Sequence, residues 1–358
     1  MKLLSQKVIF QLKTIEWKDE KVILIDQLKL PIELNYIECK NPNRIVKAIK
    51  TLEIRGAPAI GIAAAMALAL TANNSKTKSK EELFNQLEMM AKQLEMTRPT
   101  AVNLFWAVER VLRKARSAAG TTADIKEATI KEALTMAEED IKKNETMGKH
   151  GADLLEDGDV VGTICNAGWL ATAGEYGTAL GVIKVAHEQG KNISVIALET
   201  RPVLQGARLT AWELKQDGID VKVIPDGAIG YCFYKGMINK FLCGADRIVV
   251  LNNCSVINKI GTHTVSLAAK YYHIPFYAVA PFSTFDFKHN LKEIKIEKRG
   301  QAEVTEINGK RIVPAKVKVI NPAFDITPPS LVTAIITEKG IIYPPFKDNL
   351  FKLISSPG

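Results

Sequence analysis

The sequence EDGDVVGTICNAG, residues 156–168, decides the fold because the character of the chain changes there. Its acidic and glycine residues at 156–159 are typical of a turn, and the apolar run at 160–165 is typical of a buried strand. Further β-rich runs, separated by helical stretches, begin at Ile193, Val221, Lys240 or Arg247, and Phe276. The first steps match the roughly 30 residues of one β-α-β unit. The pattern therefore predicts an α/β protein whose C-terminal part is a Rossmann-like, doubly wound parallel sheet.

The residues before this change predict a different region. Three short apolar stretches, at residues 8–12, 22–25 and 34–37, are typical of a small antiparallel sheet. From Pro42 to about Asp153 the apolar side chains recur at helical spacing. We therefore expect two domains. They are a mainly helical N-terminal domain with a small sheet, residues 1–155, and a Rossmann-like catalytic domain, residues 156–358.

Charge restricts the partners. The chain has 48 lysines and arginines against 39 aspartates and glutamates, a formal net charge of +9. The excess is spread along the sequence as isolated lysines, which favours a solvated surface over a nucleic-acid partner and also suits an anionic small molecule. One charged segment, residues 294–319, predicts a hairpin-like excursion from the sheet.

Cysteine usage and the apolar runs indicate the compartment. The five cysteines contain no C-x-x-C pair, which argues against a disulfide framework or a structural zinc site. The longest small-apolar run, residues 60–72, is shorter than the ~20 residues that span a bilayer, so no membrane partner is expected. The first residues lack the apolar core of a secretory signal. We expect a cytoplasmic protein.

A parallel sheet places its ligand crevice beyond the carboxyl ends of the strands, so the residues just after each run are informative. Cys165 and Asn166 follow the first run, and polar residues including Gln205 follow the second. Asp226 follows the third and is a weaker candidate. The dinucleotide fingerprint G-x-G-x-x-G is absent, which argues against NAD.

Two arginines stand before expected helices. Arg55, Gly56 and Ala57 precede a helix of small residues, where backbone N–H groups and a glycine suit either an anion or a simple tight turn. Arg98 precedes a helix that we expect to begin at Pro99, with Thr97 or Thr100 as its cap. By itself, Arg98 is more typical of a charged residue on the surface. Arg55 and Arg98 together would indicate a phosphate site if both guanidinium groups face one crevice, because a guanidinium group matches phosphate oxygens.

Three further groups are ambiguous by pattern. Cys165 stands at a strand end before a helix, which suits a functional thiol, although most cysteines are inert core residues. Asp246 lies at the crevice if the strand is 240–243, and at the opposite end if the strand is the more β-branched 247–251. Asn258 and Lys259 open the next helix, where an ammonium group can hold a phosphate, although lone lysines usually face solvent.

Seven motifs together resemble the S-methyl-5-thioribose-1-phosphate isomerases of methionine salvage. The resemblance runs nearly end to end, and isolated motifs also occur in ribose-1,5-bisphosphate isomerases and in regulatory subunits of the translation-initiation guanine-nucleotide exchange factor. The motifs are residues 55–61, 98–100, 165–168, 199–214, 244–248, 258–262 and 321–328.

The resemblance implies a homodimeric aldose–ketose isomerase that needs no metal or cofactor. Its substrate would be the phosphorylated pentose 5-methylthioribose 1-phosphate and its product 5-methylthioribulose 1-phosphate. Cys165 and Asp246 would be catalytic, with Asp246 following the strand at 240–243 and facing Cys165. The implied substrate-binding residues are Arg55, Gly56, Ala57, Arg98, Gln205, Asn258 and Lys259.

The sequence departs from the family pattern at three places. Glu175 is an insertion, residues 226–231 replace the usual stretch, and residues 249–257 are about two residues longer than the family pattern. These changes bear on the C5 end of the sugar, so 5-deoxyribose 1-phosphate and ribose 1,5-bisphosphate remain alternative substrates. A nonenzymatic regulatory protein that senses a sugar phosphate or nucleotide is the alternative from another class.

Overall fold

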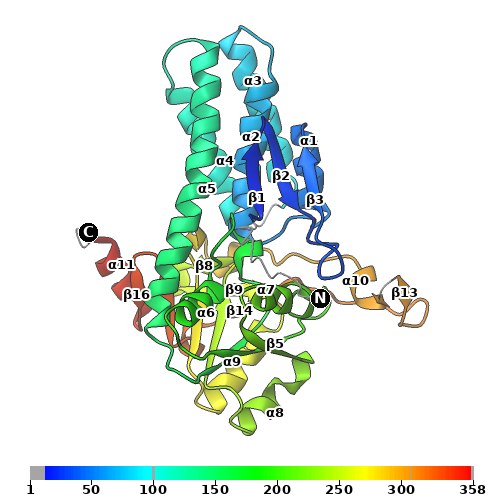
Figure 1. The fold of residues 1–358 in the computed structure, drawn as a ribbon, viewed down its shortest axis with the longest axis vertical. Helices are drawn as coiled ribbons and strands as arrows, with labels where there is room; N and C mark the ends of the chain where they lie inside the picture. Colours follow the sequence, from blue (N-terminus) through cyan, green and yellow to red (C-terminus); the bar gives the residue numbers. More distant parts are fainter. Residues whose placement is uncertain (1–12, 99–100, 308, 356–358) are drawn as a thin grey trace, which may run out of the picture.

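The computed structural model describes residues 13–98, 101–307 and 309–355 of the chain. It is an α/β structure in which a helical region stands on a larger sheet (Figure 1). This arrangement confirms the predicted fold class.

The helical region is built around one helix of small residues. Helix α2 (Ala57–Asn74) is buried on nearly all sides and packs against α1 (Pro42–Lys50), α3 (Lys80–Glu95), α4 (Val102–Ser117) and α5 (Thr122–Ala152). By length and composition α2 could cross a membrane, but 78% of it is buried inside the protein, as expected for the central helix of a core. Alanine and glycine let neighbouring helices approach it closely.

The small antiparallel sheet differs in detail from the expectation. Its strands are β1 (Ile15–Lys18), β2 (Lys21–Ile25) and β3 (Tyr36–Cys39), in the order β1-β2-β3. The expected strand at 8–12 lies outside the described residues, and β3 begins two residues later than expected. Strand β1 was missed because its alternation of Ile15 and Trp17 with Glu16 and Lys18 is short and contains two charges.

The main sheet has seven strands in the order β16-β15-β10-β7-β4-β5-β6, all parallel except β16. From β4 the chain moves outward to β5 and β6, and then returns to the other side of β4 through β7, β10 and β15. The order therefore reverses between β4 and β7, which is the switch point of a doubly wound sheet. Their bounds are β4 Val160–Thr163, β5 Ser194–Leu198, β6 Asp220–Ile224, β7 Lys240–Gly244, β10 Phe276–Val279, β15 Ala334–Thr337 and β16 Gly340–Ile342.

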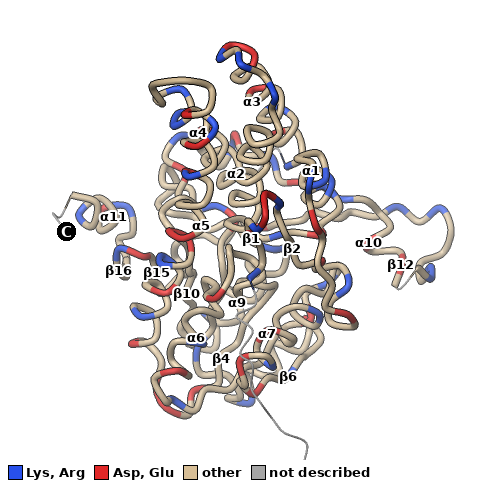
Figure 2. The backbone as a smooth tube through the Cα atoms, turned by 45° about the horizontal axis from the view of Figure 1, so that its top comes forward, with Lys and Arg blue, Asp and Glu red and all other residues tan. Residues whose placement is uncertain are grey.

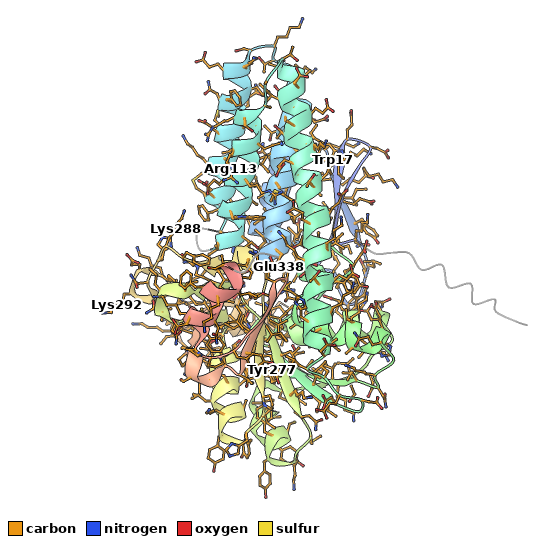
Figure 3. The ribbon with its side chains drawn as sticks, turned by 90° about the vertical axis from the view of Figure 1, so that its left-hand side faces the viewer. Trp17, Arg113, Tyr277, Lys288, Lys292 and Glu338 are labelled. Atoms are coloured by element: carbon orange, nitrogen blue, oxygen red, sulfur yellow. The ribbon has the colours of Figure 1, made fainter. Side chains whose placement is uncertain are left out.

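Helices cover both faces of this sheet. The lower half of α5, α6 (Ala179–Glu188) and α7 (Ala211–Gln216) bury one face, and α8 (Ile229–Tyr234), α9 (Thr262–Tyr271) and α11 (Phe346–Ser355) pack over the other. Figure 3 shows α5 running from the helical region down along the sheet that carries Tyr277.

A second, four-stranded sheet was not expected. Its order is β11-β8-β9-β14, with β8 (Arg247–Val249) and β9 (Ser255–Lys259) forming a hairpin between β11 (Phe285–Asp286) and β14 (Phe324–Thr327). Both candidate runs around Asp246 are therefore strands, one in each sheet. The pattern alone favoured a surface role for Asp246 beside Arg247. The structure instead places Asp246 between β7 and β8, in the lining of a pocket.

Two local expectations also need correction or qualification. Helix α4 begins at Val102 with Ala101 at its N-cap position, so Thr97 does not cap it; Pro99 and Thr100 lie outside the described residues.

The charged excursion contains α10 (Ala302–Thr305) and the antiparallel pair β12 (Glu306–Ile307) and β13 (Lys310–Arg311), and it projects to one side of the molecule in Figure 1. Figure 2 shows Lys and Arg interspersed with Asp and Glu along the chain.

Candidate active site

The site lies at the switch point of the main sheet. Thr163 of β4 pairs with Leu242 of β7, so these strands end side by side. Cys165 follows β4 and Asp246 follows β7, and both line one pocket of about 920 Å³ including its open mouth. The pocket is also lined by all seven residues that the resemblance implied for substrate binding: Arg55, Gly56, Ala57, Arg98, Gln205, Asn258 and Lys259.

The backbone conformation of Cys165 and two hydrogen bonds fix the position of this residue. Its φ of 65° is left-handed, which is uncommon for a residue with a side chain and concentrates at functional sites. Its N–H donates to Thr200 Oγ1 at 2.8 Å, and its carbonyl accepts from Thr210 Oγ1 at 2.7 Å. The thiol is buried, and Arg55 Nη1 donates to Sγ at 3.8 Å. The fold thus fixes one sulfur atom beside a positive charge.

Asp246 lines the same pocket. Its backbone N–H donates to the carbonyl of Ile257 at 2.9 Å, which fixes the turn between β7 and β8. Burial raises the pKa of its carboxyl above the ordinary value, against the opposing charges of Lys259, Arg98, Arg55 and Arg299. A raised pKa keeps a larger share of this carboxyl protonated, as a general acid requires.

Arg55 is positioned by a chain of hydrogen bonds. Its Nε donates to Gln27 Oε1 at 3.2 Å, and its Nη2 donates to the carbonyl of Asn166 at 3.0 Å and also to Asn166 Oδ1. The amide of Asn166 donates in turn to Glu213 Oε1 at 2.6 Å. Glu213 thereby sets which end of the Asn166 amide faces Arg55, and through Arg55 it orients a donor to Cys165.

Glu213 is one of the most buried carboxyls in the described chain. It is 1% exposed, its Oε2 has no hydrogen-bond partner, and burial raises its pKa to about 8. Between about pH 4.5 and about pH 8 the unfolded chain releases this proton while the folded protein retains it. Within this pH range, ionisation of Glu213 favours the unfolded chain. The contribution of Glu213 to the free energy of unfolding therefore falls by about 1.4 kcal/mol for each pH unit.

The Glu213→Gln variant should therefore gain stability over the natural protein as pH rises. Glutamine keeps the acceptor for Asn166 and cannot ionise. We expect the difference in unfolding free energy, measured by urea titration, to shift in favour of the variant from about pH 5 to about pH 8. Glu127→Gln, at an exposed position of α5, is the matched control and should track the natural protein. Parallel pH curves for Glu213→Gln and the natural protein would contradict the buried, neutral carboxyl.

The start of α2 is a tight turn that also opens into the pocket. Gly56 has a φ of 96°, and a Cβ there would lie 2.5 Å from Cα of Ala171. Only glycine fits this backbone and this close approach. The sequence left a tight turn and an anion site as alternatives, and the geometry is compatible with both. Gly56 forms the turn, and Ala57, the first residue of α2, lines the pocket, so the first N–H groups of the helix are close to it.

Lys259 and Asn258 line the same pocket at the end of β9. The expectation that they open the next helix was wrong, because α9 begins at Thr262. Both are buried, Asn258 Nδ2 donates to Thr262 Oγ1 at 3.0 Å, and Lys259 Nζ lies 4.9 Å from the ring centre of Phe324. Burial lowers the pKa of Lys259. Asp325 supports this segment because its Oδ2 accepts from the N–H groups of Gly261 and His263 at the start of α9.

Several lining residues were not singled out by sequence. Gln27 comes from the small sheet, Arg299 from the charged excursion, and Arg208 from the π-helical turn Gly206–Thr210 that follows Gln205. No motif marks Gln27 or Arg299, since each reaches the pocket through long-range packing. In the described ranges, no group of three or more His, Cys, Asp or Glu side chains is placed to hold a metal ion.

A thiol, a carboxyl and several cations at the switch point define an α/β protein with a site for a small anionic ligand. The comparisons make this more specific. The model of the initiation factor 2 subunit family matches residues 53–344. This chain therefore belongs to the initiation factor 2 subunit family.

Several relatives cover almost the whole chain. A protein of Archaeoglobus fulgidus named putative methylthioribose-1-phosphate isomerase is 50% identical over 96% of this chain and 99% of its own. The methylthioribose-1-phosphate isomerase of Thermosipho africanus is 50% identical over 95% and 97%. The crystal structure of 5-methylthioribose 1-phosphate isomerase from Pyrococcus horikoshii has a TM-score of 0.87 at 43% identity, covering 96% of this chain and 95% of that one.

Proposed function

We propose that this chain is an aldose–ketose isomerase that converts 5-methylthioribose 1-phosphate into 5-methylthioribulose 1-phosphate, a step of methionine salvage. The observation that carries the proposal is the pairing of Cys165 with Asp246 in one pocket lined by Arg55, Arg98 and Lys259. Relatives at 50% identity that bear this activity in their names support it. On the same likeness we propose a cytoplasmic homodimer that works without metal or cofactor, with residues 1–155 and 156–358 as its two domains.

The chemistry accounts for a buried acid. The phosphate on C1 prevents the ring from opening by loss of a hydroxyl proton, as ordinary aldoses do. Asp246 donates a proton to the ring oxygen, the bond from that oxygen to C1 breaks, and its electron pair stays on the oxygen. C1 is left as an oxocarbenium carbon that its phosphate oxygen stabilises. Asp246 is now a carboxylate beside four cationic side chains, Lys259, Arg98, Arg55 and Arg299.

The second half of the reaction returns Asp246 and Cys165 to their starting protonation states. Cys165, as a thiolate, takes the proton from C2, and the electron pair of that bond becomes the double bond between C1 and C2. The thiol then gives its proton to C1, and the carboxylate of Asp246 takes the proton of the C2 hydroxyl as the ketone forms. In the competing route the hydrogen moves directly from C2 to C1 with its electron pair, and Cys165 only assists. Deuterium from heavy water at C1 of the product would exclude that direct hydride transfer.

The C5 end of the pocket favours an apolar substituent. Leu28, Leu52, Val203 and Leu209 give the pocket an apolar part of its lining, and we assign C5 to that part. Arg208 is engaged, because its Nη2 donates to the carbonyls of Gln27, Leu28 and Leu30. A second phosphate at C5 would lack a free cation there. This argues against ribose 1,5-bisphosphate.

The three candidate substrates should therefore be assayed side by side. We expect the kcat/KM for 5-methylthioribose 1-phosphate to exceed that for 5-deoxyribose 1-phosphate by about 10- to 200-fold, since one apolar group in such a pocket is worth that much. Ribose 1,5-bisphosphate should be the poorest. Preference for the bisphosphate would overturn the substrate assignment, and binding without conversion of any of the three would favour the regulatory sensor.

A further inference from the structure

The charged excursion returns to the pocket at its base. The backbone around Lys298 pairs with the segment before β14: Arg299 N–H donates to the carbonyl of Asn321 at 2.9 Å, and Ala323 N–H donates to that of Glu297 at 2.8 Å. The base is thus an added extended segment rather than a loose loop. It carries Arg299 into the lining of the active-site pocket, where the side chain is only 10% exposed.

Two carboxylates hold this guanidinium group. Arg299 Nε donates to Glu297 Oε1 at 3.0 Å, and its Nη1 lies 3.6 Å from Glu303 Oε1. The other oxygen of Glu297 accepts from Arg98 Nη2 at 3.2 Å, so one carboxylate links two arginines from distant parts of the chain. Asn321 Nδ2 donates to Glu303 at 2.9 Å and fixes the second carboxylate.

The remaining donors point to a role for this pair. Arg55 and Arg208 donate to other protein atoms: Arg55 to Gln27, Asn166 and the sulfur of Cys165, and Arg208 to backbone carbonyls. By contrast, Arg98 Nε is buried without a partner, and Arg299 Nη2 has no hydrogen bond within the described part of the chain. Lys259 has no ion pair there either, and the charge of Arg299 acts on both Lys259 and Asp246. Arg98, Arg299 and Lys259 therefore have cationic donors that are still available for a ligand, and the charges of all three act on Asp246.

We propose that Arg299 is a substrate-binding residue that contacts the C1 phosphate together with Arg98 and Lys259, and that Glu297 and Glu303 are positioning residues that aim its guanidinium group. The inference rests on the proposed function, because C1 is the carbon that reacts beside Asp246 and its phosphate must lie close to that carboxyl. A dianion needs more than one positive charge, and Glu297 and Glu303 offset part of the charge of Arg98 and Arg299. We therefore assign the phosphate to both guanidinium groups together with Lys259. Arg299 contributes its Nη2, which neither carboxylate holds.

The test is binding of inorganic phosphate and of ribose 1-phosphate to the full chain by titration calorimetry. We expect Arg299→Met to weaken both by about 10- to 100-fold, the range for charged hydrogen bonds, and Arg299→Lys to weaken them about three- to tenfold, because an ammonium group loses the fork. Arg311→Met, on the exposed β13 of the same excursion, is the matched control and should bind like the natural protein. Glu303→Gln should give a smaller loss that vanishes in the Arg299→Met background.

Three results would overturn the proposal. One is phosphate affinity of folded Arg299→Met within twofold of the natural protein. If Arg299→Met does not fold, unchanged affinity of Arg299→Lys decides against it in the same way. The third is a shifted pH profile of kcat in Arg299→Lys with an unchanged KM, which would assign the residue to tuning Asp246 alone. The calorimetry needs no turnover, so a natural protein that binds phosphate but converts no pentose phosphate refutes the proposed function and leaves the role of Arg299 decided by its own variants.

Discussion

Replacement of Cys165 by serine is expected to lower kcat by a factor of about 10² to 10⁴, the usual contribution of a positioned proton-transfer group. Serine preserves the hydrogen bonds that the backbone of residue 165 makes with Thr200 and Thr210, so the site should keep its shape. Its hydroxyl is a far weaker base than a thiolate and cannot carry the proton between C2 and C1. The measurement is the steady-state rate with 5-methylthioribose 1-phosphate, together with the affinity for phosphate.

The control for this variant is another buried cysteine. Cys232 lies in α8, away from the pocket lining, and Cys232→Ser should keep kcat near that of the natural protein. Phosphate affinity of Cys165→Ser should also stay within about threefold, because the sulfur does not hold the anion. A kcat of Cys165→Ser within threefold of the natural value would remove the thiol from the mechanism.

Replacement of Asp246 by asparagine should abolish the acid step, with kcat reduced by about 10² to 10⁴. The amide has the shape of the protonated carboxyl and no proton to give. In the natural protein, burial raises the pKa of Asp246, so the acid form persists to higher pH than in an exposed aspartate. We expect kcat to fall as pH rises through this raised pKa, and the residual rate of the variant to lack that fall.

The exposed Asp220 on β6 offers a matched carboxyl-to-amide change. Asp220→Asn should leave both kcat and its pH profile unchanged. If Asp246→Asn retains the descending limb of the profile, another group donates the proton. Glu213, whose pKa of about 8 also lies in the neutral range, would be the first residue to examine.

The strand pattern predicts part of the main sheet and does not predict the second sheet. The runs at β4, β5, β6 and β10 are short and separated by helices, so local sequence predicts each of them. Strand β7 was one of two alternatives, and β15 and β16 were not predicted. The sheet of β8, β9, β11 and β14 depends on pairs such as Asn258 with Asp325, which are far apart in the chain. Such non-local pairing leaves no periodic signal, and for the same reason the pattern could not tell which run precedes Asp246.

The candidate site shows the same division. Cys165 follows from the rule that ligands lie at the carboxyl ends of parallel strands, and its neighbour Asp246 follows once β4 and β7 are known to adjoin. Arg299 could not be found in this way, because it lies in a segment that reads as a solvated hairpin. Its approach to the pocket depends on backbone pairing with the residues just before β14, which only the folded chain reveals.

The central claim is that the sulfur of Cys165 and the carboxyl of Asp246 act on one sugar phosphate in one pocket. The most direct measurement is a ³¹P and ¹³C NMR time course of 5-methylthioribose 1-phosphate with the natural chain, Cys165→Ser and Asp246→Asn. The account predicts that the natural chain replaces the glycosyl-phosphate signals with those of a ketose carrying phosphate on a primary carbon, whereas both variants bind the sugar and leave it unchanged. Unchanged signals with the natural chain, or conversion by either variant at the natural rate, would contradict it.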